Sequence, residues 1–151
     1  MIRPAEIDEQ HMVAECVNAA YSKYIERMGR APAPMLADYT ALIRNGIVYV
    51  MAAGEGIHAV LVLIPEPDHL FLENIAVHPD YQGKGLGRQL MAWVEQRAAD
   101  RNLAEIRLYT NEAMHENLDF YRRLGYEEVD RRLEDGFRRV FMRKLLPRTP
   151  K

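Results

Sequence analysis

Three glycines that alternate with other residues lie between Gln82 and Arg88, where they could bind phosphate. A glycine has no side chain, so the backbone N–H groups beside it can approach a ligand closely. The residues from Leu86 onward have helical spacing, and a helix N-terminus offers unpaired N–H groups and a partial positive charge that favour an anion. Lys84 and Arg88 add positive charge. The predicted phosphate contacts are Gln82, Gly83, Lys84, Gly85, Leu86, Gly87 and Arg88.

Two other kinds of phosphate-binding loop do not fit this segment. A dinucleotide-binding loop needs glycine where Arg88 stands, and a P-loop needs Ser or Thr where Gly85 follows Lys84. A glycine-rich turn that only allows tight packing stays open. The remaining pattern, Gln82-x-x-Gly85-x-Gly87, resembles the loop that holds the acyl-CoA pyrophosphate in the GNAT superfamily of N-acetyltransferases.

Glu73 lies in the apolar run Leu70–Val77, which predicts a strand just before the loop. A carboxylate in an apolar strand is costly unless it faces a cleft or finds a partner. Many GNAT enzymes place a general base on this strand, often acting through water, so the resemblance implies that role for Glu73; a purely electrostatic role towards a cationic substrate stays open. The resemblance also implies that backbone N–H groups of Ile75, Ala76 and Val77 face the pantetheine and the thioester carbonyl, at a bulge in the strand.

Tyr121 lies in a second stretch that resembles the family, the pattern Phe-Tyr-x-x-x-Gly-Tyr from Phe120 to Tyr126. In GNAT enzymes this tyrosine lies near the CoA sulfur and can protonate the leaving thiolate. A phenol suits that role because its reference pKa of about 10 keeps it protonated at neutral pH. A purely structural position is the alternative, since Leu118, Tyr121 and Leu124 form an apolar stripe at helical spacing.

One position departs from the family pattern. The family places an asparagine seven residues before the tyrosine, where it contacts the pantetheine arm, and here that residue is Met114. Asn117, four residues before Tyr121, lies on the same helix face and is one candidate for the contact. Asn111 is the other candidate, although it could instead cap the helix.

The two N-terminal helices are expected to recognise an amine acceptor, because this segment varies most among GNAT enzymes. Aromatic and charged side chains there could sort substrates by shape and charge. The predicted acceptor contacts are Tyr24, Arg30, Met35, Asp38 and Glu73.

The elements that must position these residues form one predicted domain over residues 1–151. Apolar periodicity, caps and turns predict a strand over 1–3, a helix from an N-cap at Asp8 to residue 28, a helix over 35–44, strands over 47–53, 57–64 and 70–77, a helix after the glycine loop, a strand over 104–110, a helix over 113–124 and two strands around Asp135 and Gly136. Residues 146–151 are expected to fray. The order matches the GNAT order and predicts an α/β fold, a mixed sheet of six to seven strands with helices on both faces. The cofactor is expected between the strands over 70–77 and 104–110.

Composition argues against several other classes of protein. The formal net charge of −2 gives no drive towards nucleic acid or anionic lipid, and no apolar run reaches transmembrane length. The first residues lack the apolar core of a signal peptide. Cys16 is the only cysteine, which fits a cytoplasmic location, and the five histidines show no metal-ligand spacing. We therefore expect no metal, no nucleic acid and no membrane partner.

Taken together, these features imply an acetyl-CoA-dependent N-acetyltransferase that moves an acetyl group directly to a primary amine of a small molecule. Direct transfer is expected because no nucleophile for an acyl-enzyme is apparent. Its partners would be acetyl-CoA and the amine. A catalytically silent acyl-CoA-binding module and an ATP-binding protein are the alternatives, and homodimerisation stays open.

Overall fold

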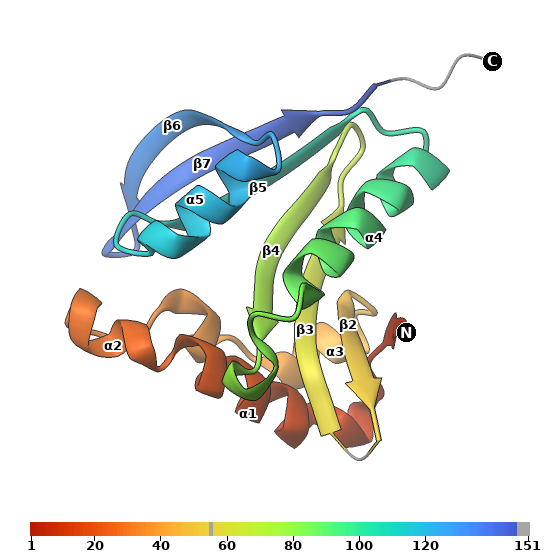
Figure 1. The fold of residues 1–151 in the computed structure, drawn as a ribbon, viewed down its shortest axis with the longest axis vertical. Helices are drawn as coiled ribbons and strands as arrows, with labels where there is room; N and C mark the ends of the chain where they lie inside the picture. Colours follow the sequence, from red (N-terminus) through yellow and green to blue (C-terminus); the bar gives the residue numbers. More distant parts are fainter. Residues whose placement is uncertain (55, 148–151) are drawn as a thin grey trace.

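The computed structural model describes residues 1–54 and 56–147, and these form one mixed sheet flanked by helices (Figure 1). The strands are β1 (Ile2–Pro4), β2 (Val48–Ala53), β3 (Gly56–Pro65), β4 (Leu70–Val77), β5 (Glu105–Asn111), β6 (Glu127–Glu134) and β7 (Phe137–Leu145), in the order β1-β2-β3-β4-β5-β7-β6. All neighbours are antiparallel except β4 and β5, which are parallel. The α/β fold and the expected order of elements are confirmed.

The helices are α1 (Gln10–Tyr21), α2 (Lys23–Met28), α3 (Tyr39–Arg44), α4 (Leu86–Asp100) and α5 (His115–Arg123), with short 3-10 turns η1 (Ile7–Glu9), η2 (Ala33–Leu36) and η3 (Pro79–Tyr81). Helices α4 and α5 lie on one face of the sheet, and α1 to α3 lie on the other (Figure 1).

Three sequence-based expectations about the N-terminal helices need correction. Asp8 is not a helix N-cap but lies inside the turn η1, where Glu9 instead accepts a 2.9 Å hydrogen bond from the Glu6 N–H. The first helix is not continuous, because it divides into α1 and α2 at Ser22. The second begins only at Tyr39.

An extended residue and an N-cap set the late start of α3. Pro34 and the residues around it form the turn η2, and the chain is extended again at Ala37. Asp38 then caps α3, since its carboxylate accepts a 3.1 Å hydrogen bond from the Ala41 N–H. At the other end of the chain, the Leu146 N–H donates to the Ala104 carbonyl at 2.7 Å. The part of the predicted frayed tail from 148 to 151 lies outside the described residues, as does Glu55 in the β2–β3 hairpin.

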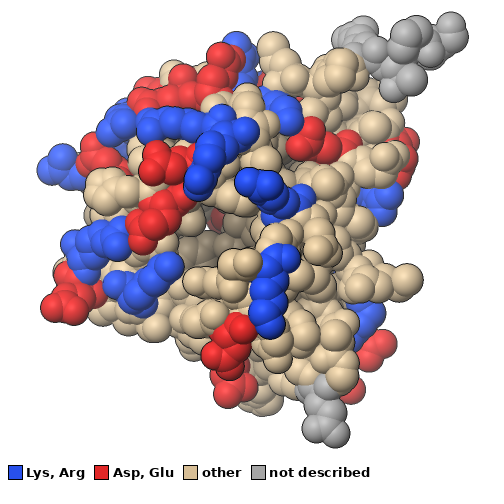
Figure 2. Space-filling model, in the orientation of Figure 1, with Lys and Arg blue, Asp and Glu red and all other residues tan. Residues whose placement is uncertain are grey.

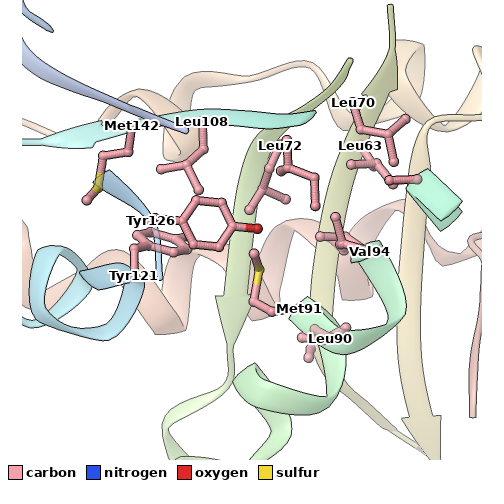
Figure 3. Close-up of a cluster of buried hydrophobic side chains, with 14 of the residues drawn as sticks. Leu63, Leu70, Leu72, Leu90, Met91, Val94, Leu108, Tyr121, Tyr126 and Met142 are labelled. Carbon is pink, nitrogen blue, oxygen red and sulfur yellow. The ribbon is translucent and has the colours of Figure 1, made fainter. Parts of the chain in front are cut away.

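Two apolar cores hold the layers together, one on each face of the sheet. Strand β3 supplies both, because Leu61 faces α4 and α5 while Val60 and Val62 face α1 and α3. Figure 3 shows side chains of α4, such as Met91 and Val94, against those of the sheet. Such close-packed layers on both faces make the sheet a rigid support for the residues at its centre.

Strands β4 and β5 pair over a short stretch only and then diverge. Residues Leu70–Leu72 pair with Ile106–Leu108, and beyond them the two strands separate (Figure 1). The predicted opening for a cofactor between these strands is therefore present.

A β-bulge marks the point at which β4 leaves β5. Against β3, Leu72 and Asn74 pair with consecutive residues, so Glu73 is the extra residue. The bulge also reverses the faces: Leu72 packs in the α4/α5 core, whereas the buried Asn74 bonds to side chains on the α1/α3 side. A bulge in this strand was expected from the family resemblance and is confirmed.

Candidate active site

The glycine loop has the backbone conformation that an anion site requires. Gly83 and Gly85 have φ of +79° and +81°, a region that other residues rarely adopt. A Cβ added at either glycine would meet no atom within 4 Å, so the space beside the backbone is open. Gly85 is the N-cap of the 15-residue helix α4, so the unpaired N–H groups at the start of this helix lie next to the loop. The loop therefore fits a phosphate or pyrophosphate group.

The other loop residues make contacts with the neighbouring helix, strand and aromatic ring. A Cβ at Gly87 would lie 3.1 Å from Cζ of Phe120, so this glycine lets α4 approach α5. Gln82 fixes the loop to the strand, since its Nε2 donates a 2.9 Å hydrogen bond to the Val77 carbonyl. The Lys84 ammonium lies 5.6 Å from the centre of the Tyr81 ring.

A large cavity extends from this loop past the end of β4, with α1, α2, α4 and α5 around it. Its volume is about 660 Å³, within the range of roughly 300–1,000 Å³ typical of ligand sites. Its lining residues are Ala20, Tyr21, Lys23, Tyr24, Ile75, Ala76, Val77, Tyr81, Gln82, Gly83, Gly85, Leu86, Gly87, Arg88, Glu116, Asn117, Phe120, Arg123 and Leu124. All the predicted cofactor contacts except Lys84, Asn111 and Tyr121 are among them.

Two further cations at this cavity, Lys23 and Arg123, were missed by sequence reasoning. They lie on α2 and α5, far in sequence from the loop, so no local pattern connects them with it. With Arg88 they place positive charge around the cavity, and Figure 2 shows Lys and Arg side chains around the hollow on this face. Such a rim favours an anionic ligand.

A smaller inner chamber adjoins the cavity at the bulge of β4. Its volume is about 40 Å³, and it shares Tyr21, Ile75 and Asn117 with the larger cavity. Glu73 and Tyr121, the two predicted catalytic residues, both line it. The structure thus brings together two residues that are 48 positions apart in the sequence.

Tyr109 and Arg139 also line the chamber and were not predicted. The Tyr109 hydroxyl donates a 2.9 Å hydrogen bond to Oε1 of Glu73, which holds the carboxylate in place. Burial, and then the nearby Glu73 charge, raise the pKa of Tyr109, so this phenol stays a donor. The Arg139 guanidinium carbon lies 4.4 Å from the centre of the Tyr109 ring.

Tyr121 is buried at the other side of the chamber. Only 4% of its surface is exposed, and burial raises the pKa of its hydroxyl. Its ring packs edge-on against Phe120 and against Tyr126, and Figure 3 shows the latter beside it. The residue therefore belongs to the core, as one interpretation from sequence expected, and it also lines the chamber with a phenol that stays protonated.

A buried polar network fixes the bulge from the α1/α3 side. The Tyr21 hydroxyl lies 2.6 Å from the Ile75 carbonyl and 2.9 Å from Oδ1 of Asn74, and burial raises its pKa well above the ordinary value. The Asn74 amide donates to the Tyr39 hydroxyl at 2.8 Å. An asparagine within an apolar strand was the available sequence signal, since a buried amide needs partners.

The two asparagines near α5 are separated by the structure. Asn117 lies on the wall common to the cavity and the chamber, where a ligand extending between them would pass. Asn111 lines only the inner chamber of these two, and its Oδ1 accepts a 2.9 Å hydrogen bond from the Ala113 N–H. This bond closes a turn before α5, whose N-cap position is Met114.

The predicted acceptor contacts are spread over several places. Tyr24 lines the large cavity, and burial raises its pKa to about 12. Asp38 lines a side pocket of about 310 Å³ that also contains Glu73. Arg30 lies 4.0 Å from the centre of the Phe137 ring in an outer groove, and Met35 packs beside the α1 core.

Other chemistries find little support in the described residues. Cys16 is 2% exposed, and burial raises the pKa of its thiol to about 11, so it is a poor nucleophile. Within residues 1–54 and 56–147, no three potential metal-binding side chains gather, and no helix is long and apolar enough to cross a membrane.

The comparison with known proteins agrees with this fold. The family model described as acetyltransferase (GNAT) domain matches residues 44–128, which include the bulge strand, the glycine loop and Tyr121. The chain therefore belongs to the GNAT family of acetyltransferases.

Among curated proteins, an uncharacterized N-acetyltransferase, YesJ, of Bacillus subtilis is 31% identical over 107 residues, covering 60% of this chain and 58% of that protein. The amino-acid acetyltransferase of Aliivibrio fischeri is 24% identical over 131 residues, covering 85% of this chain and 27% of that protein. The aligned regions thus span less than two thirds of these relatives.

Solved structures share the fold at low sequence identity. The ribosomal-protein-S18-alanine N-acetyltransferase of Escherichia coli has a TM-score of 0.78 at 19% identity, covering 100% of this chain and 96% of that one. The PaiA N-acetyltransferase of Thermoplasma acidophilum, in complex with coenzyme A, has a TM-score of 0.74 at 16% identity, covering 96% of this chain and 98% of that one.

Proposed function

We propose that this protein is an N-acetyltransferase that moves the acetyl group of acetyl-CoA directly to a primary amine of a small molecule. One observation carries the proposal: a large cavity with a phosphate-binding loop at one end meets, at the Ile75 backbone, a chamber lined by a carboxylate and a protonated phenol. Membership of the GNAT family and the coenzyme A bound to a protein of the same fold support it.

The residues of the cavity suit the parts of acetyl-CoA. The open backbone at Gly83 and Gly85, the N-terminus of α4 and the Arg88 side chain would hold the pyrophosphate. Ile75 to Val77 and Asn117 would contact the pantetheine arm, which places the thioester near the chamber. When bound, acetyl-CoA supplies an activated acetyl group; the protein supplies position and proton transfer.

Proton transfer is assigned to the two residues of the chamber. Glu73 would accept the proton that the ammonium form of the acceptor must lose, directly or through water. A new C–N bond then forms as the C–S bond breaks, and Tyr121 would donate its proton to the departing thiolate. The second proton that the nitrogen loses would return to Tyr121, directly or through water. Backbone N–H groups at the bulge would stabilise the carbonyl oxygen as charge develops.

Direct transfer fits this site better than an acyl-enzyme. The single thiol, on Cys16, is buried, and its raised pKa of about 11 keeps it protonated at neutral pH. The amine of the acceptor would therefore attack the thioester itself. Removal of water from a narrow chamber would favour this step over hydrolysis.

Binding and turnover test the proposal separately. Calorimetry with acetyl-CoA, ATP and NAD should show binding of acetyl-CoA, and a panel of primary amines should then release free CoA thiol. Acetyl-CoA binding with no thiol release from any amine would indicate a silent acyl-CoA-binding module. Absence of acetyl-CoA binding would refute the assignment of the loop.

A further inference from the structure

We propose that the acceptor is an α-amino acid with an apolar side chain, whose carboxylate binds Arg139 while its amine faces Glu73. The inference rests on the proposed function and names its substrate class. It comes from a cation and an anion that lie in the same small chamber, each next to Tyr109.

The two opposite charges lie around one side chain, that of Tyr109. Tyr109 connects them, because its hydroxyl donates to Glu73 at 2.9 Å and its ring lies 4.4 Å below the Arg139 guanidinium. Arg139 reaches this place from β7, where it pairs with Asn111 of β5. An α-amino acid carries its ammonium and its carboxylate on the same carbon, so both groups can meet such a pair at once.

Arg139 keeps donors available for a ligand. Its side chain is 14% exposed, and Nη1 is used by Glu134 at 3.1 Å and lies 3.9 Å from Asp135. Its Nε is buried and finds no hydrogen-bond partner among the described residues. A buried donor without a partner is costly, and the Nε–Nη2 edge of a guanidinium matches the two oxygens of a carboxylate. A carboxylate bound at this edge would accept a hydrogen bond from Nε and so supply the missing partner.

The cavities indicate where the rest of the acceptor lies. The chamber has about 40 Å³, and a water needs roughly 10–15 Å³ in the same measure, so only a few heavy atoms fit. The side pocket of about 310 Å³ shares Glu73, Asn74 and Tyr109 with the chamber. Its other lining residues include Leu42, Val62 and Ile64, and the carboxylate of Asp38, which also lines it, is already used by the Ala41 N–H. A side chain that extends into this pocket would therefore be apolar.

Pairs of amines that differ only in the carboxylate test the proposal. We compare leucine with 3-methylbutylamine and with leucinamide, using kcat/KM for CoA release. The wild-type protein should prefer leucine by roughly 10- to 100-fold, the usual effect of a hydrogen bond to a charged group. Arg139→Met should remove that preference by lowering kcat/KM for leucine alone. Arg139→Lys should keep part of the preference for leucine, because it retains a positive charge.

The neighbouring Arg138 provides a matched control. It lies on the same strand but lines outer grooves rather than the chamber, so Arg138→Met should leave the preference unchanged. A purely structural role of Arg139 would lower the values for all three amines equally, and that result would overturn the proposal. Thermal melting of each variant checks that it is folded.

The failure of this inference can be told from the failure of the proposed function. If 3-methylbutylamine is acetylated as well as leucine, the acetyltransferase assignment stands and the carboxylate site is wrong. If no amine is acetylated, calorimetry of leucine with the CoA-saturated protein still tests whether a carboxylate binds at Arg139. Binding that is lost in Arg139→Met would support it, and absence of binding would contradict it.

Discussion

The hydroxyl of Tyr109 donates a 2.9 Å hydrogen bond to Glu73, across the point where two parallel strands separate. Pairing between β4 and β5 ends at Leu72 and Leu108, so these are the first two residues beyond it. The bond spans the start of the opening and fixes a carboxylate that the bulge has displaced from the regular ladder. The position of the Glu73 carboxylate and the opening beside it thus arise from the same irregularity.

Replacing Tyr109 by phenylalanine should slow acetyl transfer without loosening cofactor binding. The ring stays, but the Glu73 carboxylate loses the donor that orients it. We expect kcat to fall about tenfold, which corresponds to about 1.4 kcal/mol, with the acetyl-CoA Kd unchanged. In a Glu73→Gln background the same change should have little further effect, and fully additive losses would show that Tyr109 acts independently of Glu73.

Removing the Tyr121 hydroxyl should affect turnover more than binding. Tyr121→Phe keeps the buried ring and its contacts with Phe120 and Tyr126, so the fold should be retained. Loss of a general acid commonly lowers the rate by about 100-fold. Steady-state kinetics beside acetyl-CoA calorimetry checks this, and an equal loss of kcat and affinity would reject the general-acid role.

The glycine loop can be tested against a glycine of the same conformation elsewhere. Gly85→Ala forces a Cβ onto a φ of +81° beside the cavity, and Gly46→Ala does the same at +73° after α3. Both should lose about 1–2 kcal/mol of stability. Only Gly85→Ala should raise the acetyl-CoA Kd, by about tenfold, and similar Kd values for the two variants would contradict phosphate binding at the loop.

An ion pair joins two helices that line the cavity, α2 and α5. It should make the stability of the fold depend on pH, and the sign of that dependence can be predicted. Arg27 on α2 bonds both carboxylate oxygens of Glu116 on α5, at 2.6 and 3.1 Å. The Arg27 hydrogen bond lowers the pKa of Glu116 from 4.5 to about 2. A lowered pKa means that this stabilisation is complete above about pH 4.5 and is lost as the pH falls towards 2.

The contribution of this pair to stability should be small, because the Glu116 side chain is 51% exposed and its charge is screened. Glu116→Gln should lower the free energy of unfolding by at most about 1 kcal/mol at pH 7 and make no difference at pH 2. Urea unfolding at both values measures it. If wild type and Glu116→Gln differ more in their free energy of unfolding at pH 2 than at pH 7, the ion pair is not the cause.

The parts of the site that lie close together in sequence could be predicted from it. The loop from Gln82 to Arg88 carries its own signal, because alternating glycines and a following helix are local features. Glu73 was visible as a lone carboxylate in an apolar strand. Tyr121 was identified only through a family resemblance, since helical spacing alone also fits a core residue, and in the structure it is buried and lines the chamber.

The parts that depend on strand register could not be predicted. Arg139 and Tyr109 meet because β7 returns beside β5, and a shift of one residue would turn the arginine to the other face. The bulge at Glu73 is likewise set by pairing with β3 and by the buried Asn74 network. The start of α3 at Tyr39 reflects competition between helical spacing and the turn around Pro34, which sequence periodicity does not resolve.

If Glu73 is the base for acetyl transfer in the chamber next to the large cavity, its loss should slow the chemical step and change its pH dependence. Both are measured by the single-turnover rate of acetyl transfer in the preformed acetyl-CoA complex, for wild type and Glu73→Gln across a range of pH. We expect the variant to bind acetyl-CoA normally but to transfer about 100-fold more slowly and to lose the rise in rate towards alkaline pH. An unchanged rate and pH profile would show that Glu73 is not the base.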